Sequence, residues 1–171
     1  MKSGHNFISI KIKNRKEKER GIFIQEGEDW ILLQSLFTDF MVDGFKIISK
    51  NYILSIDRDE HDAFVEEVLI SCDKLSIPGM TIPLKTYPLF EFLMTNQKTF
   101  QLFLNKENSS YIGNINKLLA KSFYLNPFGK KVGWLDYYLL FRMDFIRLLA
   151  IDTDYINSLL AYNKRILNST H

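Results

Sequence analysis

The residues best suited to binding chemistry are basic side chains that gather near the start of the sequence. The first twenty residues hold seven Lys or Arg against two Glu, whereas the whole chain has a formal net charge of only +2. The candidates are Lys11, Lys13, Arg15, Lys16 and Lys18, together with Lys50 in a later turn. Such a cluster can contact the phosphates of RNA or single-stranded nucleic acid. A solvated hairpin tip that resists edge-to-edge aggregation is the simpler interpretation.

The two tryptophans, Trp30 and Trp134, are the aromatic candidates for binding. Each lies in an apolar run that also contains an acid, Asp29 or Asp136. An exposed tryptophan could stack on a base or anchor a peptide. Burial in the core is the alternative that we favour, because tryptophan is highly buried on average.

Motifs of catalysis and of cofactor binding are not found in the sequence. Neither of the glycine-rich nucleotide-binding patterns occurs, and the histidines lack the spacing of metal ligands. Acids at Asp57, Asp59 and Asp62 could act as an acid and base pair, but capping of a helix explains them more simply. We therefore predict no catalytic residue, no metal site and no cofactor, and a protein that is not an enzyme. An enzyme of unrecognised type stays open as a further alternative.

The apolar segments argue for a cytoplasmic protein without a membrane span. The start, MKSGHNFISIKI, lacks the continuous apolar region of a signal peptide. The longest apolar run, residues 134–151, is interrupted by four charged side chains. The single cysteine, Cys72, excludes an intramolecular disulfide and is expected to be a buried thiol.

Alternating apolar residues predict five short strands before residue 57. They form a first hairpin around the basic run, a buried strand within DWILLQSLF, and two strands in GFKII and YILSI. A helix capped by Asp57 or Asp59 follows. We expect Phe64, Val68 and Cys72, with Val65 and Leu69 beside them, on its apolar face, and Asp62, Glu66 and Glu67 on the opposite face. The prolines and glycine of residues 76–83 predict a linker, and a short apolar helix then extends to about Asn96.

The second half of the chain repeats the apolar pattern of the first at an offset of 92 residues. The matched positions are Ile8, Ile10, Ile12, Gly21 and Leu33 with Phe100, Leu102, Leu104, Gly113 and Leu125. Each half also ends in a predicted helix, the second being DYINSLLAYNKRIL. Two interpretations follow: a tandem duplication, or one larger α+β domain in which a continuous sheet carries helices on one face.

The stretch IISKNYILSI, Ile47 to Ile56, resembles the closing motif of Sm-like small β-barrels, in which a short polar turn joins two apolar strands. The likeness covers residues 7–57 and, more faintly, residues 99–152. RNA-binding members of that family carry a basic residue and a glycine in this turn. Lys50 and Asn51 match in type here, whereas the glycine is absent and the second half has Arg142 and Asp144 instead.

The resemblance implies a mostly β protein with helices (α+β), built from two tandem Sm-like barrel units that are each followed by a helix. The expected boundaries are 1–75 for the first unit, 76–98 for the linker and short helix, and 99–171 for the second unit. A groove between the units, lined by residues 76–92, would suit a protein partner. We predict a protein-interaction module, with RNA or single-stranded nucleic-acid binding through residues 11–20 as the alternative, and leave the oligomeric state open.

Overall fold

Alternation of apolar residues produces strands along most of the chain, as expected. The computed structural model describes residues 6–75, 81–106 and 109–169. The strands are β1 (Asn6–Ile12), β2 (Glu19–Glu26), β3 (Trp30–Thr38), β4 (Met41–Ser49), β5 (Ile53–Asp57), β6 (Phe100–Phe103), β7 (Ser110–Leu118), β8 (Ser122–Gly129), β9 (Gly133–Trp134), β10 (Leu139–Arg142) and β11 (Leu148–Ile151). The helices are α1 (Glu60–Ser71), α2 (Thr86–Thr95) and α3 (Asp154–Ser169), and short 3-10 turns are η1 (Lys50–Tyr52) and η2 (Met143–Phe145).

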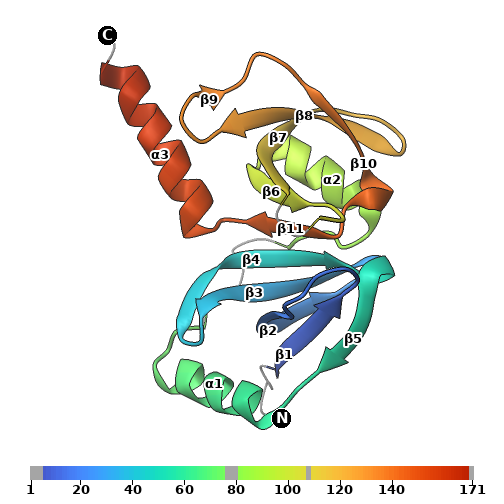
Figure 1. Ribbon diagram of the computed structural model, residues 1–171, viewed down its shortest axis with the longest axis vertical. Helices are drawn as coiled ribbons and strands as arrows, with labels where there is room; N and C mark the ends of the chain where they lie inside the picture. Colours follow the sequence, from blue (N-terminus) through green and yellow to red (C-terminus); the bar gives the residue numbers. More distant parts are fainter. Residues whose placement is uncertain (1–5, 76–80, 107–108, 170–171) are drawn as a thin grey trace.

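The prediction of two barrel units, each followed by a helix, is wrong. The described strands join in one open antiparallel sheet with the order β10-β8-β7-β6-β11-β4-β3-β2-β1-β5, and β9 pairs with β8 beside this path. β4 pairs with β11 from the far end of the chain, so the first half does not close on itself (Figure 1). The physical reason is that the apolar edge of β4 is covered by a strand about a hundred residues away, a pairing that local periodicity does not encode.

The central core cluster draws its side chains from both halves and from α2. Trp30, Leu32 and Ile47 pack together with Phe90 of α2 and with Phe123 of β8. The Phe90 and Phe123 rings lie 5.0 Å apart between centroids, and Trp30 meets Phe90 edge-on at 6.1 Å. The helix expected next to a linker is therefore a core element. Residues 76–80, the centre of that expected linker, lie outside the described residues.

The offset of 92 residues seen in the sequence also relates the strand pairings of the two halves. Ile8 pairs with Gly21 across β1 and β2, and Phe100 pairs with Gly113 across β6 and β7. Both glycines are needed for close approach, since a Cβ would lie 2.3 Å from the Gln34 carbonyl oxygen in one half and 2.2 Å from that of Asn126 in the other. Strand order also matches, β5-β1-β2-β3-β4 against β11-β6-β7-β8-β10. Duplication itself stays a prediction.

The buried face of helix α1 agrees only in part with the one that its sequence indicated. Val65 and Leu69 are buried as expected, but Asp62 and Glu66 are buried with them, whereas Phe64 is 53% exposed. Cys72, expected to be buried, is exposed at the end of the helix. The predicted cap at Asp59 is confirmed: its carboxylate accepts from the Asp62 N–H, and Asp62 accepts from the Asp59 N–H in return.

Candidate functional site

The basic side chains predicted to bind nucleic acid are held largely by neighbouring acids and carbonyl groups. Arg15 contacts Glu19 at 2.9 Å and lies over the Phe103 ring. Lys18 contacts Asp57 at 2.9 Å, and Lys50 contacts Glu26 at 2.5 Å. The Lys11 ammonium donates to the Lys16 carbonyl, and the side chains of Lys13 and Lys16 are exposed. The ion pairs of Arg15, Lys18 and Lys50 therefore reduce the positive field of the hairpin.

The two tryptophans occupy different environments. Trp30 is 2% exposed, as we favoured, and its indole N–H donates to the Thr86 hydroxyl at 3.2 Å. That hydroxyl donates in turn to Asp29 at 2.7 Å, and this hydrogen bond lowers the pKa of the Asp29 carboxyl. Trp134 is 38% exposed and meets Phe128 edge-on at 5.1 Å. Of the two tryptophans, only Trp134 is exposed.

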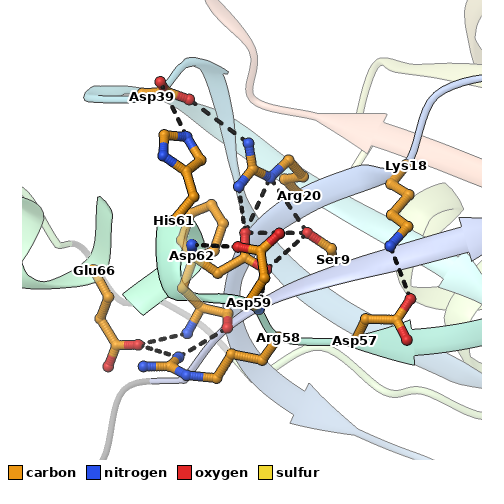
Figure 2. Close-up of polar contacts among 11 residues, drawn as sticks. Ser9, Lys18, Arg20, Asp39, Asp57, Arg58, Asp59, His61, Asp62 and Glu66 are labelled. Carbon is orange, nitrogen blue, oxygen red and sulfur yellow. Dashed lines mark hydrogen bonds and ion pairs between the residues drawn. The ribbon is translucent and has the colours of Figure 1, made fainter. Parts of the chain in front are cut away.

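A polar cluster connects α1 to the sheet (Figure 2). It contains Asp62, the most deeply buried charged side chain among the described residues. Asp62 is completely buried, and it accepts hydrogen bonds from Arg20 of β2 and from the Ser9 hydroxyl of β1. Glu66, one turn later, accepts from the Phe7 N–H at 2.8 Å and from Arg58. The positions of both acids in the sequence indicated the solvent face of the helix, and Asp62 was expected only to cap it.

Serine, histidine and aspartate lie near one another in this cluster, but they do not form a nucleophilic triad. The His61 ring contacts the exposed Asp39 at 3.3 Å, not Ser9 (Figure 2). Ser9 is 3% exposed, and its hydroxyl donates to the Asp62 carboxylate, so the His61 imidazole does not serve it as a base. The arrangement stabilises the position of the helix.

Replacing Asp62 by asparagine is expected to lower the free energy of unfolding by about 1 to 3 kcal/mol at neutral pH, because a charged hydrogen-bond network is lost. Burial raises the pKa of the Asp62 carboxyl, but hydrogen bonds from Arg20, the Asp59 N–H and Ser9 outweigh it, so the pKa lies below its ordinary value of 3.8. A folded pKa below the unfolded one stabilises the protein above the unfolded value of 3.8, and this contribution is lost as the pH falls from there through the lower, folded pKa. Urea unfolding of both proteins between pH 2.5 and 7 measures the difference.

The matched control is Asp39→Asn, because Asp39 contacts the same Arg20 at 3.8 Å but from an exposed position. Its effect should stay within about 0.5 kcal/mol, as is usual for exposed ion pairs. A loss at Asp62→Asn that is constant across the whole pH range would contradict the assigned role of the charge.

Both ends of the sheet are open edges that carry exposed apolar side chains. Among the described residues β5 pairs only with β1, and β10 pairs only with β8. Leu54 is 62% and Ile56 50% exposed on β5, and Leu140 is 57% exposed on β10. Phe145, just beyond β10, is 55% exposed. The sequence predicted β5 within YILSI, but nothing local says which strand ends a sheet.

A groove of about 770 Å³ lies between the two halves, and none of residues 81–92 lines it. Within the predicted range, Thr86 and Tyr87 line a second, smaller pocket of about 370 Å³. Arg15, Glu19 and Lys46 form one wall of the larger groove, and Phe128 and Tyr137 belong to the opposite side. Glu19 is 7% exposed and contacts both Arg15, at 2.9 Å, and Lys46, at 2.6 Å. The charges of this wall are therefore directed largely at one another.

No family model, no curated protein and no solved structure matches this chain. Across residues 6–75, 81–106 and 109–169, no helix has the length and apolar character needed to cross a membrane. Function is therefore inferred from the side chains and sheet edges described above.

Proposed function

We propose that this protein is a protein-interaction module that binds an extended segment of a partner by strand addition at the open edges of its sheet. An open edge offers unpaired backbone N–H and C=O groups, and neighbouring side chains select the partner. The single observation that supports the proposal is the exposure of Leu54, Ile56 and Leu140 along β5 and β10. Apolar side chains of this size are usually covered when they gather along one edge.

Neither edge strand contains the lysine or proline that commonly hinders pairing at natural sheet edges. The outermost strand β5 has the sequence ILSID, with one acid at its end and a register shift against β1 at Leu54. Strand β10 has the sequence LLFR, with one arginine at its end. The ion pairs of the hairpin make nucleic-acid binding the weaker alternative.

A site-specific photo-crosslinker tests the proposal in the host cell. We expect p-benzoylphenylalanine at Leu54 or at Leu140 to give covalent adducts with protein. The matched control is the same group at Ile70, which is 51% exposed but lies on α1 and not at an edge. Adducts in equal yield at Ile70 would contradict binding at the edges, and nuclease-sensitive adducts would favour the RNA alternative.

A further inference from the structure

The pairing of β4 with β11 shows how one end of each half joins the other. Ile47 lies opposite Leu149, Lys46 opposite Ala150, and Ile48 opposite Leu148 in an antiparallel register. Ile47 and Leu149 are both completely buried. This junction is a strand-to-strand contact between the last strand of one half-sheet and the first strand of the other.

The two open edges are the counterparts of the strands in this junction. The offset of 92 residues relates Leu32 to Tyr124. Leu32 pairs with Ile47 of β4, and Tyr124 pairs with Leu140 of β10, so β10 corresponds to β4. The same offset relates Ile10 to Leu102. Ile10 pairs with Ile56 of β5, and Leu102 pairs with Leu149 of β11, so β5 corresponds to β11. Leu140 and Ile56 therefore occupy the positions that Ile47 and Leu149 hold in the junction.

The exposed apolar residues fall at the positions that a junction would cover. Leu140 is 57% and Ile56 50% exposed, whereas their counterparts Ile47 and Leu149 have no exposed surface. Pairing of the two free edges would therefore bury Leu140 of β10 against Ile56 of β5. The two edges differ from each other, so they suit a head-to-tail contact and not a symmetric one.

A second contact of the junction also has its counterpart positions at the open edges. The Arg147 guanidinium lies over the Tyr52 ring at 4.5 Å, next to the hydrogen bond from the Ser49 N–H to the Arg147 carbonyl at 2.9 Å. In the same alignment of η1 with η2 and of β5 with β11, Tyr52 corresponds to Phe145 and Arg147 corresponds to Leu54. Phe145 and Leu54 are both exposed. The open edges therefore have two apolar side chains at the positions where the junction has the Arg147 cation over the Tyr52 ring.

We propose that the partner at the open edges is a second copy of this chain, with β10 of one copy antiparallel to β5 of the next. Leu140 then lies opposite Ile56, and Phe145 contacts Leu54. The inference rests on the proposed function and names the partner of the same edges. A pair of copies joined in this way keeps one free β5 edge and one free β10 edge, so association continues from copy to copy.

Variants with one disabled edge test this arrangement. Leu140→Asp leaves only the β5 edge intact, and Ile56→Asp leaves only the β10 edge. In light scattering after size exclusion, the wild type should exceed the monomer mass of 20.1 kDa increasingly with concentration. Each variant alone should stay a monomer, and an equimolar mixture should form a heterodimer of twice that mass. The control Ile70→Asp changes an equally exposed residue away from the edges and should behave as the wild type.

Disulfide formation between copies tests the register of β10 against β5 without an introduced charge. In a Cys72→Ser background, Leu140→Cys protein mixed with Ile56→Cys protein should form a covalent heterodimer on mild oxidation, because directly opposite residues have Cβ atoms about 4.5 to 5.5 Å apart. Much slower coupling is expected when Ile70→Cys replaces either partner. Circular dichroism and thermal unfolding verify that every variant is folded.

Two results would overturn the inference. A wild type that stays monomeric at all concentrations removes the second copy as partner, and a single variant that dimerises alone shows symmetric edge pairing instead. The proposed function fails on a different result, the loss of edge-specific photo-crosslinks to any protein. Edge crosslinks to other proteins with a monomeric wild type would reject the self-association and keep the strand-addition module.

Discussion

Replacing Ile47 by aspartate is expected to abolish folding of the whole chain. Ile47 has no exposed surface, lies at the junction of β4 with β11 and belongs to the core cluster that includes both halves. An unpaired carboxylate in such a place costs several kcal/mol, in addition to the loss of the buried isoleucine. Domains of ordinary size have a free energy of unfolding of only about 5 to 15 kcal/mol. Expression in soluble form and far-ultraviolet circular dichroism provide the measurement.

The equivalent position at the open edge provides the control. Leu140→Asp makes the same chemical change in the counterpart strand β10, but Leu140 is 57% exposed. Its free energy of unfolding should change by no more than about 0.5 kcal/mol, as for other surface substitutions. A folded Ile47→Asp protein with unchanged stability would show that the β4 and β11 contact does not hold the two halves together.

The strands were predictable because one-residue alternation is a local property of the sequence. Ile8, Ile10 and Ile12 mark β1 without any knowledge of the rest of the chain, and the registers of β1 with β2 and of β6 with β7 follow the same offset. The continuous sheet was not predictable, since pairing of Ile47 with Leu149 depends on positions distant in sequence. The alternative of one continuous sheet described the connectivity better than the tandem barrels.

The buried face of α1 was predicted wrongly in part because charge was taken as a sign of exposure. Asp62 and Glu66 are buried, since Arg20 and Arg58 from other segments supply hydrogen bonds to them. A buried acid needs such partners, and partners from distant strands leave no mark in the local pattern. One signal did exist: Val65 and Leu69 share the same helix face with both acids.

Replacing Phe90 by alanine is expected to lower the free energy of unfolding by about 3 to 5 kcal/mol, the usual cost of a large cavity. Phe90 is completely buried in α2, between Trp30 of the first half and Phe123 of the second. For a chain of this length the melting temperature should fall by about 6 to 20 °C. Phe37→Ala is the control, because Phe37 is 75% exposed and its loss should change stability by about 0.5 kcal/mol at most.

The same experiment tests whether α2 couples the two halves. In a Trp134→Phe background, Trp30 fluorescence reports on the packing of the first half against α2, and circular dichroism reports on all strands together. Because Phe90 contacts aromatic rings on both sides, its removal should shift both transitions by the same amount and leave them coincident. A Trp30 transition that moved alone would contradict a shared core. The helix expected beside a linker would then stabilise one half only, and the β4 and β11 pairing would be the sole cooperative link.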